Sequence, residues 1–278
     1  MATTFQQEVA RGERFQFGAN WQRFLTTLTE ERIVEAVVSL KEWLGVETLQ
    51  GQRFLDIGSG SGLFSLAAKR LGATVYSFDY DPQSVACTQE LKRRFFPQDA
   101  TWTIVEGSIL DEAFVQSLGQ FDIVYSWGVL HHTGQMWQAL ANAGQLVAPN
   151  GKLFIAIYND QGSWSRRWKK LKAWYNRLPA AARPLFALAV MGGREAKFIL
   201  IALVRFNLGD YIRTWTAYGQ GSRGMSKWHD LIDWIGGYPF EVAKPEEIFA
   251  FYYERGFTLA KLKTCGGGVG CNEFVFVK

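Results

Sequence analysis

The stretch Phe54-Leu-Asp-Ile-Gly-Ser-Gly-Ser-Gly-Leu-Phe-Ser65 decides the fold. It begins as a short apolar strand, passes through Gly58, Gly60 and Gly62, and continues with apolar residues at helical spacing. Glycine suits this turn because it adopts positive φ without a steric penalty and lets a ligand approach the backbone. Three glycines alone also fit an ordinary tight turn, so a second signal is needed.

A carboxylate after the next predicted strand provides that signal. The strand Val75–Phe78 is followed by Asp79, 19 residues beyond Gly60, where an acid can accept hydrogen bonds from the hydroxyls of a ribose. A loop that binds a pyrophosphate reads GxGxxG, whereas this one reads GxGxG and follows Asp56. The Asp56 carboxylate would repel a pyrophosphate and attract a ligand that carries an ammonium group.

Short apolar runs and helical stretches alternate from Gln52 to Tyr158, which predicts a parallel sheet covered on both faces. Two amphipathic helices are expected over Asn20–Leu44, and the last two strands, Thr258–Thr264 and Asn272–Val277, should form an antiparallel hairpin. The predicted fold is α/β: a Rossmann-like, seven-stranded, mostly parallel sheet with an antiparallel C-terminal hairpin, N-terminal helices and a helical insert between strands five and six. The expected divisions are an N-terminal helical lid (1–50), the α/β core (51–160), the insert as a cover of the acceptor pocket (161–240), and the last helix with the hairpin (241–278).

The loop Asp56-x-Gly58-x-Gly60-x-Gly62 resembles the Asp/Glu-x-Gly-x-Gly-x-Gly loop of class I S-adenosylmethionine-dependent methyltransferases. The resemblance covers about residues 50–160 and 245–278, and the layout is similar to that of the ubiquinone-pathway O-methyltransferases, which does not establish the acceptor. Many family members have Asp where this chain has Ser108. The resemblance implies S-adenosyl-L-methionine as the cofactor, held by Asp56, Gly58, Gly60, Gly62, Asp79, Tyr80, Ser108, Ile109 and Trp127.

Methyl transfer to a hydroxyl group needs a proton acceptor at the carboxyl edge of the sheet. The chain has three histidines: His131 and His132 follow the fourth strand, and His229 lies in the insert. Histidine suits this role because its ordinary pKa lies near neutrality. The catalytic candidates are His132, His229 and Tyr158. The alternative for His132 is packing or capping of the loop, and the alternative for His229 is a solvated position on an ordinary capped helix. No Asn-Pro-Pro-Tyr motif follows strand four, which argues against methylation of a base amine.

The insert opens with the one strongly basic stretch, Ser163–Leu178. On a helix, Trp164, Trp168, Leu171, Tyr175 and Leu178 share one stripe, and the cations, Lys172 included, lie largely away from it. Such a helix can bind a membrane surface or nucleic acid, or can simply pack its stripe on the domain. The apolar runs Leu185–Met191 and Phe198–Val204 favour a lipophilic role or a dimer interface over RNA.

Composition limits the remaining choices. The net charge of +4 is too small to indicate a nucleic-acid partner, so DNA is not expected. The N-terminal residues show no secretory signal, and three cysteines without metal-ligand spacing predict neither a disulfide framework nor a metal site, so a cytoplasmic location is expected. The leading hypothesis is a methyltransferase for a small, lipophilic or aromatic acceptor, at oxygen. An RNA methyltransferase and a non-catalytic cofactor-binding protein are the alternatives.

Overall fold

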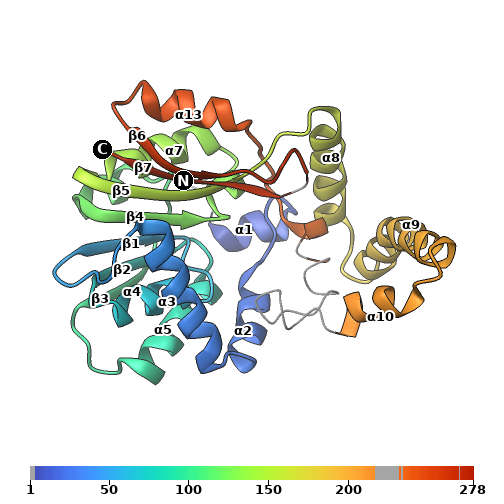
Figure 1. The fold of residues 1–278 in the computed structure, drawn as a ribbon, viewed down its shortest axis with the longest axis horizontal. Helices are drawn as coiled ribbons and strands as arrows, with labels where there is room; N and C mark the ends of the chain where they lie inside the picture. Colours follow the sequence, from blue (N-terminus) through green and yellow to red (C-terminus); the bar gives the residue numbers. More distant parts are fainter. Residues whose placement is uncertain (1–3, 217–231, 233, 269) are drawn as a thin grey trace.

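A seven-stranded sheet forms the centre of the molecule (Figure 1). The computed structural model describes residues 4–216, 232, 234–268 and 270–278. The strand order is β3-β2-β1-β4-β5-β7-β6. The strands are β1 (Arg53–Ile57), β2 (Thr74–Asp79), β3 (Trp102–Glu106), β4 (Phe121–Trp127), β5 (Val147–Tyr158), β6 (Thr258–Lys263) and β7 (Cys271–Val277).

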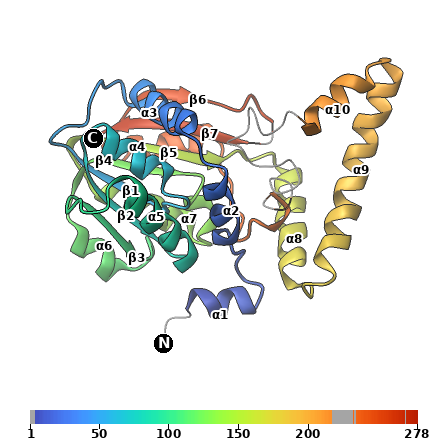
Figure 2. The same cartoon turned by 90° about the horizontal axis from the view of Figure 1, so that it is seen from below.

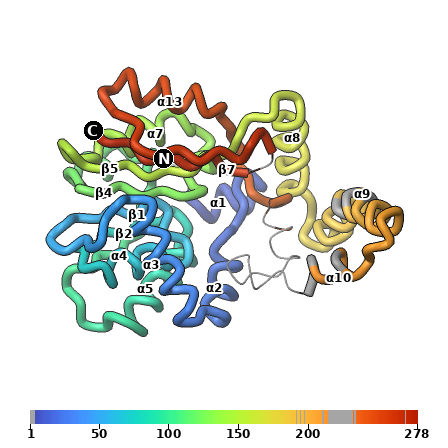
Figure 3. The backbone as a smooth tube through the Cα atoms, viewed as in Figure 1, coloured from blue at the N-terminus to red at the C-terminus, as the bar shows by residue number. Residues whose placement is uncertain are grey.

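Strands β1 to β5 are parallel to one another, and β7 runs antiparallel to both β5 and β6. Figure 3 shows β7, at the red end of the chain, beside β5. The predicted seven-stranded, mostly parallel sheet with an antiparallel C-terminal pair is confirmed. β5 begins at Val147, directly after the helix that ends at Gln145 and its C-cap, Leu146.

Two apolar cores lie on opposite faces of the sheet. One contains side chains from α3 (Glu30–Leu44), α4 (Leu63–Arg70) and α5 (Pro82–Phe95), and the other from α6 (Glu112–Leu118), α7 (Met136–Gln145) and α13 (Pro245–Tyr253). Because both faces are covered, the carboxyl ends of the parallel strands remain as the edge at which a ligand can enter.

The N-terminal region holds one helix more than the sequence pattern predicts. Helices α2 (Gly18–Thr26) and α3 match the two expected amphipathic helices, and α1 (Phe5–Ala10) precedes them. A capping box starts α1: the Thr4 hydroxyl accepts from the Gln7 backbone N–H, and the Gln7 side chain accepts from the Thr4 backbone N–H. This Thr-x-x-Gln pattern is the signal that could have predicted α1.

The insert contains α8 (Ser163–Arg177), α9 (Arg183–Val204) and α10 (Leu208–Thr216). Both views show α8 between the sheet and α9 (Figures 1 and 2). The two apolar runs expected as separate segments belong to one 22-residue helix, α9, which continues through Gly192 and Gly193. No helix among the described residues is long and apolar enough to cross a membrane. The two ends of the insert meet at the sheet, where Asn159 pairs with Ala243.

The orientation of α8 differs from the prediction at two positions. Lys172 is fully buried and donates to the Trp234 carbonyl, with its ammonium 4.3 Å from the centroid of the Trp234 ring. Trp164, predicted to share one stripe with Tyr175, is 57% exposed, whereas Tyr175 is buried. A buried ammonium needs such partners because an unpaired charge in an apolar interior is costly. Lys172 therefore joins α8 to the chain that returns to the sheet.

Candidate cofactor and acceptor site

A cavity of about 970 Å³ opens at the carboxyl ends of the parallel strands. The glycine loop and the ends of β2 and β4 form one end of its lining, and residues of α1, α2 and the insert complete it. Of the expected cofactor-binding residues, all but Gly62 line it: Asp56, Gly58, Gly60, Asp79, Tyr80, Ser108, Ile109 and Trp127. His132 and Tyr158 line the same cavity.

The glycine loop is held against the end of β2. The backbone N–H groups of Gly58 and Ser59 both donate to the Phe78 carbonyl, at 2.8 and 3.1 Å. Gly62, outside the cavity lining, has φ +81°, and a Cβ there would lie 2.8 Å from the Thr88 Cα of α5. Gly62 therefore permits close packing of the loop on α5, whereas the backbone of Gly58 and Gly60 faces the cavity.

Asp79 connects the end of β2 to the loop. Its Oδ2 accepts from the Gly60 N–H and its Oδ1 from the Asp81 N–H, both at 2.9 Å. Burial raises the pKa of Asp79 to about 6, against the lowering effect of these hydrogen bonds. Each carboxylate oxygen has a second lone pair, so Asp79 can still accept from hydroxyl groups of a ligand.

Asp56 ends a buried chain of hydrogen bonds. The Ser65 hydroxyl donates to Asp56 Oδ2 at 2.5 Å, Ser65 and Ser77 share a hydrogen bond of 2.7 Å, and the Trp102 indole N–H donates to the Ser77 hydroxyl at 3.0 Å. Burial raises the pKa of Asp56 to about 7, and repulsion from Asp79 adds to this effect while Ser65 opposes it. The two carboxyl groups at this end of the cavity, Asp56 buried and Asp79 half-buried, suit a positively charged ligand.

The remaining expected cofactor contacts lie around the ends of β3 and β4. The Ser108 hydroxyl accepts from the Leu110 N–H at 3.2 Å, and the Ile109 carbonyl accepts from the Asn142 side chain at 2.7 Å. The Trp127 indole N–H donates to Glu273 of β7 at 3.1 Å, which fixes the position of the indole ring at the end of β4. These bonds hold the lining in place rather than leaving it free to rearrange.

His132 is the better placed of the two adjacent histidines. Its Nδ1 lies 2.6 Å from the Pro239 carbonyl, so Nδ1 carries the proton and Nε2 is left as the proton acceptor. Burial, with the nearby charges of Lys172 and Arg14, lowers its pKa to about 3. His131 is fully buried, and its Nδ1 accepts from the Tyr158 backbone N–H at 3.3 Å, so it helps to hold the end of β5 in place.

Tyr158 stands at the end of β5 among aromatic rings. Its ring centroid is 3.9 Å from His131, 5.4 Å from His132 and 5.6 Å from Trp234. Trp168 of α8, Phe198 of α9 and Trp234 line the same end of the cavity. This end is therefore aromatic and apolar, in contrast to the acidic end at Asp56 and Asp79.

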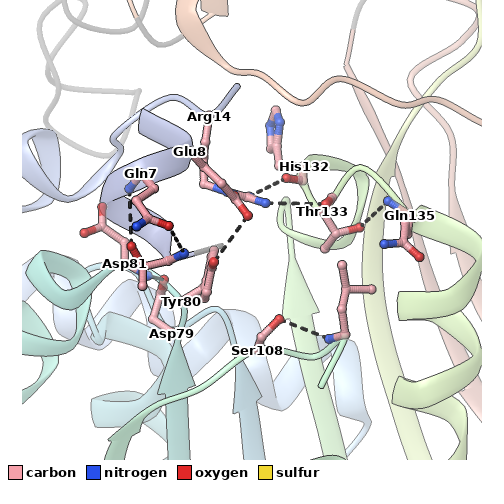
Figure 4. A network of polar contacts seen from close by, with 12 residues as sticks. Gln7, Glu8, Arg14, Asp79, Tyr80, Asp81, Ser108, His132, Thr133 and Gln135 are labelled. Atoms are coloured by element: carbon pink, nitrogen blue, oxygen red, sulfur yellow. Dashed lines mark hydrogen bonds and ion pairs between the residues drawn. The ribbon is translucent and has the colours of Figure 1, made fainter. Parts of the chain in front are cut away.

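The N-terminal segment contributes contacts that sequence reasoning did not assign to particular residues. Figure 4 shows Arg14 between the ends of β2 and β4. It donates to the carbonyls of His132 and Thr133 at 2.9 and 3.4 Å, and its guanidinium lies 5.0 Å from the Tyr80 ring centroid. The Tyr80 hydroxyl donates to Glu8 of α1 at 3.3 Å. The segment also supplies cavity-lining rings: Phe5, Phe15, Phe17, Trp21 and Phe24.

Among the sequence candidates, His229 lies outside the described residues. Within residues 4–216, 232, 234–268 and 270–278, no group of three or more His, Cys, Asp or Glu side chains could hold a metal ion. His132 and Tyr158 are therefore the proton-transfer candidates whose positions the structure gives.

Comparison with known proteins agrees with this arrangement. Residues 55–153, from β1 to β5, match the family model for a methyltransferase domain. Residues 55–153 are therefore a methyltransferase domain. The chain is 31% identical over 121 residues to the ubiquinone biosynthesis O-methyltransferase of Caulobacter sp. strain K31, covering 41% of this chain and 44% of the relative. It spans about half the length or less of the curated relatives it matches.

Two solved methyltransferases show the same fold. The N-methyltransferase NodS from Bradyrhizobium japonicum WM9, in complex with S-adenosyl-L-homocysteine, aligns with a TM-score of 0.52 at 15% identity, covering 95% of this chain and 98% of NodS. Magnesium protoporphyrin IX methyltransferase from Synechocystis PCC 6803, with bound S-adenosyl-L-homocysteine, gives 0.51 at 15% identity, covering 100% and 89%. At these identities the likeness concerns the fold.

Proposed function

We propose that this methyltransferase transfers a methyl group to an oxygen atom of a small, lipophilic or aromatic acceptor. One observation carries the proposal: a single cavity joins the acidic glycine-loop end, at Asp56 and Asp79, to the aromatic end at Tyr158, Trp168 and Trp234. A cationic methyl donor and an apolar acceptor therefore fit side by side in one cavity. S-adenosylmethionine, when bound, supplies an activated methyl group on a sulfonium.

The acidic end fits this cofactor. Asp79 would accept hydrogen bonds from the ribose hydroxyls, and Asp56 would attract the ammonium group of the amino-acid portion. Ser108 and Ile109, after β3, would contact the adenine, and Tyr80 and Trp127 would border it. Gly58 and Gly60 would let the cofactor approach the backbone. This assignment is supported by the cavity lining and by the raised pKa values of the two acids.

The aromatic end would hold the acceptor and keep water out. Phe17 lies 5.1 Å from the His132 ring, and Tyr158 packs edge-on against Trp234, so the walls around the acceptor are rigid rings. Such surfaces favour a flat or apolar acceptor over a charged one. Excluding water also limits unproductive hydrolysis of the donor.

His132 would accept the proton of the acceptor hydroxyl at Nε2. Its hydrogen bond to Pro239 fixes the tautomer that this role requires, and its low pKa keeps the ring neutral at physiological pH. Tyr158 would orient the acceptor, and His229 stays a candidate from the sequence. A weakly basic histidine suits a hydroxyl of enhanced acidity, such as a phenol, over an aliphatic alcohol.

The proposal includes a cytoplasmic location and a small-molecule acceptor in place of DNA or RNA. A homodimer through the insert is a further candidate from the sequence. Support for a small acceptor comes from the aromatic end of the cavity and from the names of the curated relatives, which are biosynthetic O-methyltransferases.

The test uses S-adenosylmethionine labelled in its methyl group and extracts of cells as the source of acceptors. We expect the label in a small molecule that partitions into organic solvent, and its loss when His132 is replaced by Ala. Label in RNA would establish the RNA methyltransferase instead. Cofactor binding without any labelled product would leave a binding protein without catalytic activity.

A further inference from the structure

Helix α9 exposes an apolar face along most of its length. Leu185, Leu188, Leu200 and Leu203 are 72%, 60%, 62% and 48% exposed, and Ile199 is 38% exposed. At about 100° per residue these five side chains fall within about 120° of one another around the helix. From Leu185 to Leu203 the face extends about 27 Å, at 1.5 Å per residue. Scattered exposed leucines need no explanation, but a continuous face of this length indicates an interaction surface.

The exposed apolar surface continues beyond α9. Val204 and Phe206 are 71% and 98% exposed, and Leu208 and Ile212 of α10 are 45% and 57% exposed. On α8, Trp164 and Trp174 are 57% and 68% exposed. Tryptophan at the border of an apolar surface is typical of segments that lie at a membrane interface.

The same region carries the excess of positive over negative charge. Residues 161–216 have a net charge of +9, whereas the whole chain has +4, so the remainder carries −5. The exposed cations of α8 include Arg166, Arg167, Lys169 and Lys170, and Arg205 follows α9. An insert that combines exposed cations with exposed leucines matches an anionic lipid surface, which has negative headgroups above an apolar layer.

The apolar helix also reaches the cavity. Phe198 of α9 and Trp168 of α8 line it, next to Tyr158. Phe198 is 44% exposed, and at about 100° per residue it lies about 140° around α9 from Leu185 and Leu203. Helix α9 therefore contributes both to the exposed apolar surface and to the cavity lining.

We propose that α8, α9 and α10 dock on the surface of an anionic bilayer, with α9 lying flat in the headgroup region. The docking surface consists of Leu185, Leu188, Ile199, Leu200, Leu203, Val204 and Phe206, with the α8 cations and tryptophans at its edge. Only the further step, in which the bilayer delivers the acceptor, rests on the proposed function. A second copy of the chain is a poorer occupant because two regions of charge +9 would repel each other, and RNA would leave the leucines in water.

Vesicle flotation tests the docking surface with the full chain. We expect it to float with vesicles of phosphatidylcholine and phosphatidylglycerol at low salt, and to float much less at high salt or with phosphatidylcholine alone. A chain that stays at the bottom with the anionic vesicles at low salt would overturn the proposal. If light scattering then showed a dimer that dissociates in the Leu185→Gln/Leu203→Gln variant, the surface would belong to a second copy.

Two variants and their matched controls locate the surface. Leu185→Gln/Leu203→Gln should weaken vesicle binding by roughly tenfold or more, because two side chains that would be buried in the bilayer become polar. The control is Val34→Gln/Val38→Gln on α3, whose valines are 49% and 46% exposed, and it should leave vesicle binding unchanged. Lys170→Glu should weaken vesicle binding by roughly fivefold to thirtyfold. Its control is Lys263→Glu on β6, the same charge change at another exposed site, which should weaken vesicle binding far less. Equal effects of a variant and its control would contradict this placement.

The two proposals fail in different ways. Calorimetric titration with S-adenosylmethionine reports on the glycine-loop end, which none of these variants touches. Vesicle binding without cofactor binding would refute the proposed function and keep the docking surface. Cofactor binding and labelled product without vesicle binding would keep the proposed function and refute the docking surface. If both hold, adding the vesicles should raise turnover of a lipophilic acceptor in the unaltered chain and not in Leu185→Gln/Leu203→Gln.

Discussion

The Trp21 indole of α2 lies directly over Gly60 of the glycine loop. A Cβ on Gly60 would come 3.0 Å from Trp21 Nε1, so the two residues are in close contact. The same N-terminal segment donates from the Gly18 N–H to Asp81 Oδ2 at 2.8 Å, just beyond the end of β2. The N-terminal segment therefore covers this part of the glycine loop.

Gly60→Ala tests this contact. We expect weaker cofactor binding, because the new methyl group pushes against Trp21 and φ at this position is +54°. Gly45→Ala at the end of α3 is the matched control, because its φ is +62° and nothing lies within 4 Å of the added Cβ. Both variants should lose about 1 kcal/mol of stability from the backbone conformation. Equal cofactor affinity in the two variants, measured by calorimetry, would contradict the importance of the contact.

Asp79→Asn should weaken binding of both S-adenosylmethionine and S-adenosyl-L-homocysteine by about 1.5–3 kcal/mol, the range for a hydrogen bond to a charged group. The amide keeps the shape of the side chain and removes its charge. Asp111→Asn is the control, because Asp111 only caps α6, where it accepts from the Phe114 N–H at 3.1 Å. Unchanged affinity in a folded Asp79→Asn protein would refute the cofactor assignment.

Cofactor affinity should depend on pH between about 5 and 8. The pKa values of Asp56 and Asp79 are raised to about 7 and about 6, and a cationic ligand binds their deprotonated forms. Affinity should therefore rise with pH through this range, with release of protons on binding. Calorimetry in buffers of different ionisation enthalpy measures that release. An affinity that stays flat from pH 5 to 8 would be inconsistent with the two acids facing the ligand.

The same pKa values predict how the free protein responds to pH. Both carboxyl groups have a higher pKa in the folded chain than in the unfolded chain, so their contribution to stability is present at low pH and is lost as pH rises through about 6 and 7. A bound cation offsets that loss. The increase in Tm produced by S-adenosylmethionine should therefore be larger at pH 8 than at pH 5.

His132→Ala should lower turnover by about 10²–10⁴-fold and leave cofactor affinity nearly unchanged. Because the pKa of His132 is about 3, kcat should not fall through protonation of this residue between pH 8 and pH 5. Tyr158→Phe, assayed with the same acceptor, separates orientation by the hydroxyl from packing of the ring. Full activity in both variants would mean that the acceptor arrives deprotonated or that His229 accepts the proton.

The sheet and the glycine loop could be predicted because local patterns determine them. Alternating apolar runs define parallel strands, and Asp56, Gly58, Gly60 and Asp79 have fixed positions relative to β1 and β2. The contacts of Arg14 could not be predicted in this way. Arg14 and His132 are 118 residues apart, and no periodicity relates one to the other.

The insert shows a second limit of pattern reasoning. The helical period of α8 predicts which side chains share a face, but it does not predict that Lys172 is buried. The aromatic rings in contact with the Lys172 ammonium belong to Trp234 and Phe240, which are more than 60 residues away in the chain. The pair Gly192-Gly193 suggested a break between two apolar runs, although α9 continues through it. Glycine lowers helix propensity without preventing a helix that its flanking residues support.

The position of β7 has a consequence for how the protein is made. β7 follows β6 in the chain but separates it from β5 in the sheet. During synthesis β6 leaves the ribosome before the strand that pairs with it, and until then β5 has an open edge that can bind a wrong partner. Gly270 and Cys271, which line the cavity, join the fold in the same step. A nascent chain halted before residue 270 would hold a complete glycine loop and an incomplete acceptor wall.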